Sequence, residues 1–195
     1  MSKTKIPTRV WNKIADFSLS LEVDVEKDVS VSIDGEEIVV KGPKGELRKK
    51  FNSRLLDIEV DEENRKVILR VFNPRKFERS YLNTMRSHLR NMMLGVTRGF
   101  SKKLIVAFAH FPIRVEVDEK NRVVLIHNFL GEKKPRKAKI IGDSTKVIVK
   151  EDQIIVEGIS KEEVGQTAAN LRQATKIRRK DPRVFMDGIY VLKEG

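Results

Sequence analysis

The stretch VSIDGEEIVV, Val31–Val40, decides the fold, because its pattern comes back 84 positions later as VEVDEKNRVV in Val115–Val124. Both copies begin with apolar residues at alternate positions, which share one face of a β-strand. Both then pass through residues that favour a turn and end in a Val-Val pair. Each stretch is predicted to form strands joined by a turn, and the recurrence indicates a duplicated unit.

Three further pairs of segments extend the repeat in the same order. Their first members are Gly45–Lys50, Ile58–Leu69 and Leu89–Asn91, and their partners are Gly131–Arg136, Val147–Val156 and Leu171–Gln173. Chance similarity between β-rich segments is the alternative to a duplication. We predict two tandem homologous domains, at residues 21–100 and 101–195, after an N-terminal extension at residues 1–20 whose structure the pattern leaves open.

A helix is predicted near the end of each half. In the first half, Asn73 can cap a helix, Pro74 suits its first position, and apolar residues recur at spacings of three and four across Phe77–Val96. In the second half, Ser160 and Glu163 have the spacing of a capping box. Several strands followed by one helix are typical of an α+β fold. Each domain is therefore predicted to be a small, mainly antiparallel sheet packed on one side by a helix.

The positive charge is concentrated in a few segments. Of the 40 lysines and arginines, 25 lie in four stretches that contain only three acidic residues, namely residues 40–54, 75–103, 133–139 and 172–183. The remaining 132 residues carry 15 basic and 25 acidic side chains, a net charge of −10. Clustered cations create local positive potential that attracts polyanions, so RNA or DNA is the expected partner. A solvated basic face without a partner is the alternative.

Several other classes of function lack support. The chain has no cysteine, which excludes disulfides and thiol catalysis, and its apolar runs are too short for a membrane span. His88, His110 and His127 lie in unrelated contexts without the spacing of metal ligands. Gly42–Gly45 has the glycine and lysine of a phosphate loop, but Pro43 removes a backbone amide. We expect no catalysis, metal, cofactor, membrane contact or small-molecule substrate.

The basic segments supply the candidate binding residues. Lys133–Lys139 reads as a loop or strand edge that presents its cations outward to a phosphate backbone. Arg172–Arg183 is predicted to continue the second helix as far as Asp181-Pro182. No helix-turn-helix, finger or zipper pattern occurs, so binding to the shape and backbone of folded RNA is favoured over base reading in DNA. The predicted RNA-binding residues are Lys133, Lys134, Arg136, Lys137, Lys139, Lys176, Arg178, Arg179, Lys180, Arg183, Arg98 and Lys102.

At this level of detail the chain resembles a known family. The resemblance rests on Val39–Leu47, Gly95–Phe100, Ala109–Ile113, Asn128–Lys133, Gln173–Thr175, Lys180-Asp181 and Phe185–Val191. Together these motifs resemble the universal large-subunit ribosomal protein called number six in bacteria and nine in eukaryotes. The HFP, NFLGEK and DGIYV motifs resemble its archaeal and eukaryotic branch, and the lack of a long lysine-rich extension resembles archaeal members.

The resemblance implies two homologous α+β domains and a structural role in the large subunit, cytoplasmic in the ribosome. It implies binding to large-subunit ribosomal RNA near the sarcin–ricin loop, mainly through the C-terminal domain. The implied neighbours are other ribosomal proteins and translation factors. Two alternatives stay open: a free-standing RNA-binding protein or RNA chaperone outside the ribosome, and an enzyme that acts on RNA.

Overall fold

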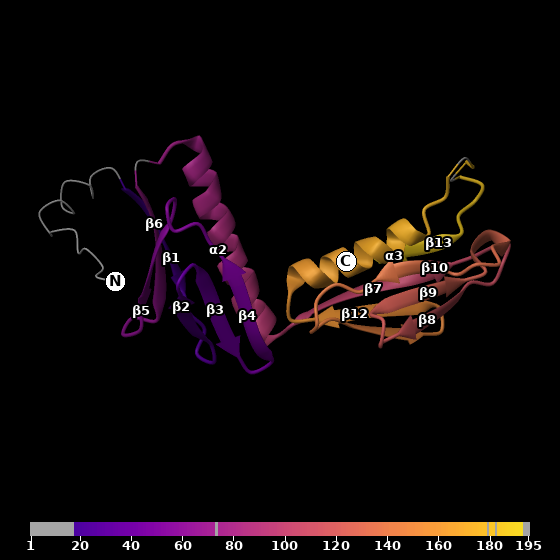
Figure 1. The fold of residues 1–195 in the computed structure, drawn as a ribbon, viewed down its shortest axis with the longest axis horizontal. Coiled ribbons are helices and arrows are strands. Elements are labelled where there is room, and N and C mark those ends of the chain that lie inside the picture. The colour runs from indigo at the N-terminus through magenta and orange to yellow at the C-terminus, as the bar shows by residue number, and fades with distance from the viewer. Residues whose placement is uncertain (1–17, 73, 179, 182, 193–195) are drawn as a thin grey trace, which may run out of the picture. The chain divides into compact units, whose positions relative to one another are not determined.

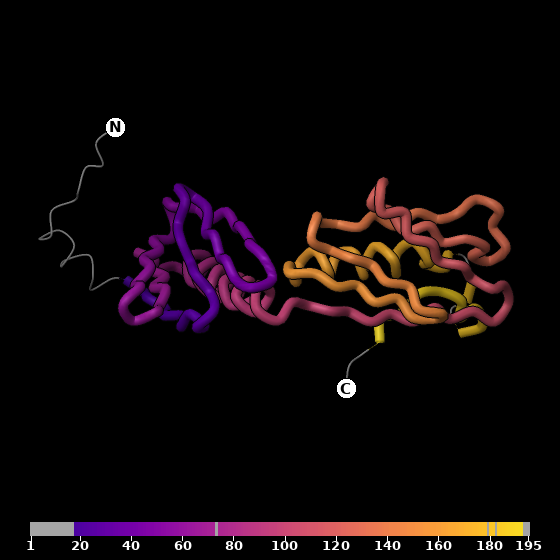
Figure 2. Tube along the Cα trace, turned by 90° about the horizontal axis from the view of Figure 1, so that it is seen from below, coloured from indigo at the N-terminus to yellow at the C-terminus, as the bar shows by residue number. Residues whose placement is uncertain are grey.

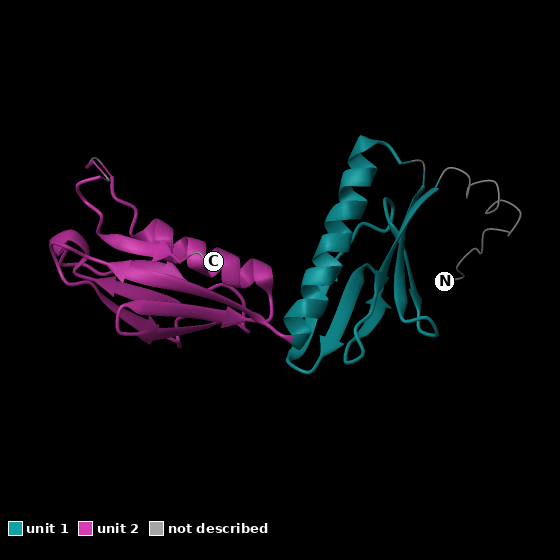
Figure 3. Ribbon diagram, turned by 180° about the vertical axis from the view of Figure 1, so that it is seen from behind, with its two compact units in different colours: residues 1–97 teal, residues 98–195 magenta. Residues whose placement is uncertain are grey.

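The structure is a computed structural model that describes residues 18–72, 74–178, 180–181 and 183–192. The chain forms two compact units, residues 1–97 (unit 1) and residues 98–195 (unit 2), coloured separately in Figure 3. The chain passes once from unit 1 to unit 2, as the trace in Figure 2 shows. The tandem two-domain fold predicted from the repeat is confirmed.

Unit 1 contains two three-stranded antiparallel sheets and a long helix (Figure 1). One sheet has the strand order β1-β6-β5 and the other has the order β2-β3-β4. The elements are β1 (Ser18–Asp24), β2 (Ser30–Asp34), β3 (Glu37–Gly42), β4 (Gly45–Lys50), β5 (Asp57–Asp61), β6 (Lys66–Phe72) and α2 (Lys76–Thr97). The helix α2 packs against β1, β3, β4 and β6.

Unit 2 repeats this plan and adds one strand. Its sheets have the orders β11-β12-β7-β13 and β10-β9-β8, again antiparallel. The elements are β7 (Phe100–Ala107), β8 (Arg114–Asp118), β9 (Val123–His127), a 3-10 turn η1 (Phe129–Gly131), β10 (Arg136–Lys139), β11 (Lys146–Lys150), β12 (Gln153–Gly158), α3 (Lys161–Ala174) and β13 (Gly188–Val191). Strand for strand, β1 to β6 correspond to β7 to β12, so the topology itself is duplicated.

The core of unit 1 lies between α2 and the sheets. Leu82, Met85, Leu89 and Val96 of α2 are buried against strand residues such as Leu69. Asn73 lies outside the described residues. The sequence prediction is wrong at Phe77, whose side chain is 65% exposed. Four residues before Leu82 comes Glu78, so the buried row, extended back by one helical turn, misses Phe77.

The core of unit 2 uses a shorter helix. Val164, Ala168 and Leu171 of α3 pack on apolar residues of β7, β10, β12 and β13. Ser160 caps the helix as predicted, because its hydroxyl accepts a hydrogen bond from the Glu163 amide at 3.3 Å. The predicted continuation of this helix to Asp181 is wrong, since α3 ends at Ala174.

Candidate nucleic-acid interface

Unit 2 carries most of the excess positive charge. Unit 1 has 19 basic and 15 acidic side chains, whereas unit 2 has 21 basic and 13 acidic side chains. The net charges are therefore +4 and +8. Two of the four basic stretches lie wholly in unit 2, and their arrangement in space decides whether they can bind one ligand.

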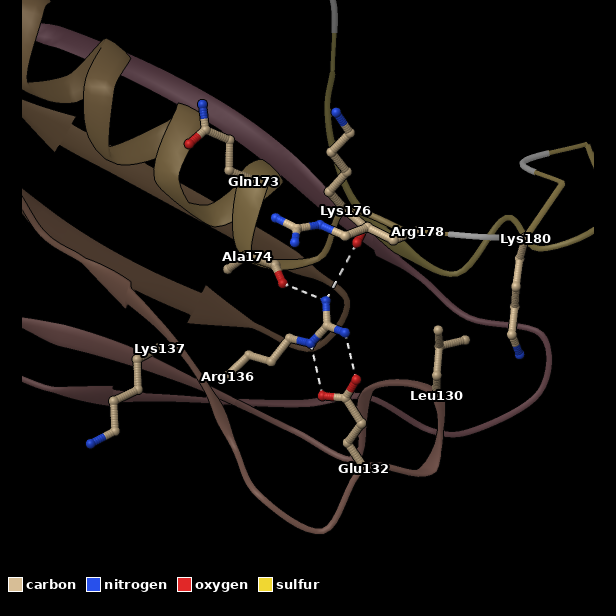
Figure 4. A pocket seen from close by; sticks show the side chains of 9 residues that line it. All are labelled: Leu130, Glu132, Arg136, Lys137, Gln173, Ala174, Lys176, Arg178 and Lys180. Atoms are coloured by element: carbon tan, nitrogen blue, oxygen red, sulfur yellow. Dashed lines mark hydrogen bonds and ion pairs between the residues drawn. The ribbon is translucent and has the colours of Figure 1, made fainter.

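These two basic stretches meet at one open hollow of about 630 Å³, which we call the basic hollow. Its wall comes from the segment around β10 on one side and from the end of α3 and the following chain on the other (Figure 4). The nine lining residues are Leu130, Glu132, Arg136, Lys137, Gln173, Ala174, Lys176, Arg178 and Lys180. Five of these residues are cationic and only Glu132 is acidic.

The end of α3 brings the second basic stretch to this place. Thr175 is buried, and its hydroxyl donates to the carbonyls of Leu171 and Arg172, at 3.4 and 3.3 Å. The same oxygen accepts the Ile189 amide of β13 at 3.0 Å. The bond from Ile189 ties the end of α3 to the added strand. Lys176 follows the helix, and its carbonyl oxygen lies 3.5 Å from Nη1 of Arg136 in β10.

Arg136 joins the two walls of the basic hollow. Its guanidinium makes a bidentate ion pair with Glu132, at 2.5 and 2.8 Å, and donates to the Ala174 carbonyl at 2.8 Å (Figure 4). It also lies 4.3 Å from the centre of the buried Phe129 ring. The hydrogen bonds from Arg136 lower the pKa of the Glu132 carboxyl. The expectation that every cation of this stretch points outward is therefore wrong for Arg136.

In the basic hollow, Glu132 is paired with Arg136. The Lys137 charge acts on the Asp118 carboxylate, whose pKa it helps to lower. No ion pair links Lys137, Lys176 or Arg178 to a carboxylate within the described ranges. All three side chains are exposed. Such a concave group of solvated cations is suited to bind a chain of phosphates.

A set of ring and hydrogen-bond contacts fixes the far end of the second stretch. The Lys180 ammonium lies 4.2 Å from the centre of the Phe185 ring, which stacks on His110 at 5.1 Å. The buried Asp187 accepts the Ala109 amide at 3.0 Å and lies 3.3 Å from His110 Nδ1. Sequence reasoning treated the histidines as unrelated residues and missed this pair. Its contacts hold two loops together, so we assign it a structural role.

The remaining predicted residues lie around the basic hollow or apart from it. Lys133, Lys134 and Lys139 are exposed on either side of Arg136 but do not line the hollow. Arg183 is exposed near Asp181, with 3.5 Å between Nε and the carboxylate. Lys102 lines a second hollow beside α3 and β13. Arg98 lies between α2 and β7 and lines neither hollow, and Arg179 lies outside the described residues.

The equivalent basic stretch of unit 1 is arranged differently. Glu46 of β4 forms ion pairs with Lys41 at 3.2 Å and Arg48 at 2.7 Å, and Glu37 lies 3.8 Å from Lys50. The hydrogen bonds from Arg48 and Lys41 lower the pKa of Glu46. Three cations of this stretch are thus partly neutralised within the unit.

Other kinds of site are not visible in the parts of the chain that the structure describes. No group of three His, Asp or Glu residues there gathers as metal ligands would. Neither α2 nor α3 has the length and apolar composition needed to cross a bilayer.

Comparisons with known proteins point in one direction. A family model described as Ribosomal protein L6 matches residues 25–99 and 111–188, one stretch for each repeat. The chain is 48% identical over 174 residues to large ribosomal subunit protein uL6 of Staphylothermus marinus, covering 89% of this chain and 94% of that protein. The corresponding protein of Methanobrevibacter smithii is 47% identical over 173 residues, with 89% and 94% covered. That of Desulfurococcus amylolyticus is 45% identical over 179 residues, with 92% and 96% covered. The chain therefore belongs to the ribosomal protein L6 family and is of the archaeal type.

Proposed function

We propose that this chain is a structural constituent of the large ribosomal subunit and binds large-subunit ribosomal RNA through the basic hollow of unit 2. The observation that carries the proposal is the meeting of two separate basic stretches at one concavity whose single carboxylate is already paired. Backbone phosphates of folded RNA have the charge and spacing to occupy such a surface. Unit 2 then acts as the main RNA-binding domain.

Family membership makes the chain a structural ribosomal protein rather than an enzyme. The resemblance supports a position near the sarcin–ricin loop, at the edge of the site where translation factors bind. Neighbouring ribosomal proteins are the other expected partners. Chemical footprinting of large-subunit RNA with and without the chain tests the position, because protection should cluster at that loop and the helices next to it.

The salt dependence of RNA binding tests the use of the basic hollow. In one variant, Lys137, Lys176 and Arg178 are all replaced by Gln, and its binding to transcribed large-subunit ribosomal RNA is measured against salt concentration. Each lost phosphate contact lowers the slope of log K against log salt by about 0.7–0.9, so we expect a slope smaller by about 2 to 3.

The matched control removes the same charge elsewhere in unit 2. Lys120, Lys146 and Lys150 are exposed and line neither hollow, and their replacement by Gln should leave the slope nearly unchanged. Equal slopes for the two triple variants would show that only total charge matters and would contradict binding by the basic hollow.

Sedimentation separates this proposal from a free-standing RNA-binding protein or chaperone. A constituent of the subunit should remain with large subunits in high-salt gradients, because it is held by many contacts at once. Release of the chain from intact subunits at moderate salt would instead favour a protein that acts outside the ribosome.

A further inference from the structure

Beside the basic hollow lies a second concavity of different chemistry, which we call the apolar hollow. It has a volume of about 580 Å³ and lies between α3 and the added strand β13. Apolar side chains, including Ile177 and Val191, form part of its wall. Lys102, Arg172 and Lys176 also line it, and none of its described lining residues is acidic.

A tyrosine ring lies at this hollow. Tyr190 is 43% exposed and belongs to β13. A Cβ added at Gly188 would lie 3.4 Å from a Tyr190 ring carbon and 3.6 Å from the Thr175 carbonyl oxygen, and Thr175 also lines the hollow. The ring therefore rests near a glycine and leaves area free for a flat ligand.

The α3 side of the apolar hollow is lined by small residues. Gly165 and Ala169 of α3 line the apolar hollow, and a Cβ added at Gly165 would meet nothing within 4 Å. The apolar hollow is therefore open space beside α3 and not a closely packed contact. Its volume lies within the range of about 300–1,000 Å³ that is typical of small-ligand sites.

The two hollows adjoin, because Gln173 and Lys176 line both of them. A strand of RNA whose phosphates lie in the basic hollow would reach the apolar hollow by crossing Lys176. There a base can stack on an aromatic ring, while cations at the rim hold its phosphate. An apolar side chain from a partner protein would also bury Lys102 and Arg172, but it would not offer them the negative charge that a nucleotide carries.

We propose that the apolar hollow binds one unpaired nucleotide of the RNA that occupies the basic hollow, with its base stacked on Tyr190 and its phosphate near Arg172 and Lys102. This inference rests on the proposed function and adds to it the feature of RNA that is recognised. The recognised RNA is a helix with a bulged or looped-out base rather than a continuous duplex.

The test combines affinity, salt slope and nucleotide footprinting, with the full-length chain and transcribed large-subunit ribosomal RNA. Replacing Tyr190 by Leu should weaken binding about 5- to 100-fold, the range expected for one lost base stack, and should leave the salt slope unchanged. Tyr190→Phe keeps the ring and should bind within about twofold of wild type. Arg172→Gln should lower the slope by about one.

A second variant fills the apolar hollow and keeps the Tyr190 ring. Gly165→Leu places a side chain in the apolar hollow and should favour the helix, so it should melt no lower than wild type while binding as weakly as Tyr190→Leu. Gly165→Ala is its control and should bind like wild type. In wild type, one unpaired nucleotide should be protected from chemical modification of its ribose, and in both weak variants it should be reactive.

The outcomes distinguish the two levels of the proposal. Wild-type binding that lacks any salt dependence would defeat the proposed function itself. Salt-dependent wild-type binding, together with unchanged affinity and footprint in Tyr190→Leu and Gly165→Leu, would overturn only the nucleotide site.

Discussion

Arg136 and Lys137 are neighbours in the chain, yet their charges serve different purposes. The Arg136 side chain is 28% exposed and bonds to Glu132 and to the backbone at the end of α3. Lys137 is exposed and forms no ion pair within the described residues. Because β10 alternates its side chains between faces, one residue joins two parts of the unit while the next faces solvent.

At this scale we expect Arg136→Ala and Lys137→Ala to differ in stability. Loss of the charged hydrogen bonds of Arg136 should destabilise unit 2 by about 2 kcal/mol, whereas Lys137→Ala should change stability by less than about 0.5 kcal/mol. Denaturant unfolding of each variant measures both values. Because the pKa of Glu132 is lowered in the folded state, its ion pair with Arg136 stabilises unit 2 above a pH of about 4, near the ordinary pKa of a glutamate. This stabilisation is lost as the pH falls through the lowered pKa of Glu132. Equal stability of the two variants would contradict a clamping role.

Sequence reasoning identified the right residue types here but could not separate their roles. Lys137, Lys176, Arg178 and Lys180 were predicted binding residues, and they do line one hollow. Nothing local distinguishes Arg136, because its partners include a backbone carbonyl 38 positions away. Tyr190 and Gln173 line the hollows without any signal in their spacing, since only the tertiary fold places them there.

Among the elements, the turn between β3 and β4 has a structural purpose. A Cβ added at Gly42 would lie 2.6 Å from Val96 Cγ2, and the Lys44 amide donates to the Val96 carbonyl at 2.9 Å. The turn thus packs on the C-terminal end of α2 and satisfies one of its free carbonyls. This contact explains the glycine at position 42 of the sequence that resembles a phosphate loop.

We expect Gly42→Ala to destabilise unit 1 by about 1–3 kcal/mol, because the buried, β-branched Val96 has little freedom to move. Thermal unfolding measures the change. Gly165→Ala is the matched control: its added methyl meets open space in a helix, so it should stabilise by about 0.5–1 kcal/mol. A Gly42→Ala variant as stable as wild type would show that the turn is not packed on α2.

The success of prediction at this scale depended on how local each signal was. The repeated strands and the Ser160 cap follow from alternation and from a three-residue spacing, so they were predictable. The end of α3 was not, because the residue that follows it, Thr175, is bound to Ile189, 14 positions away in a strand that only the tertiary fold places there. The exposure of Phe77 likewise depends on where the sheet lies beneath the helix.

Over the whole molecule, the duplication produced two units of the same fold in which the charged side chains are paired differently. In unit 1, basic side chains of β3 and β4 form ion pairs with Glu37 and Glu46. In unit 2, Arg136 is paired with Glu132, and a segment rich in basic residues joins α3 to β13. The net charge is +8 on unit 2 and +4 on unit 1. The fold is shared, and the proposed RNA contact belongs to the copy with unpaired cations.

The most direct test of this division is ultraviolet crosslinking of the chain to RNA inside purified large subunits, with crosslinked residues mapped by mass spectrometry. We expect crosslinks in residues 133–139 and 172–183, and a further one at Tyr190 from the nucleotide site. Crosslinks confined to unit 1, with both of those segments free of RNA, would contradict binding through the basic hollow.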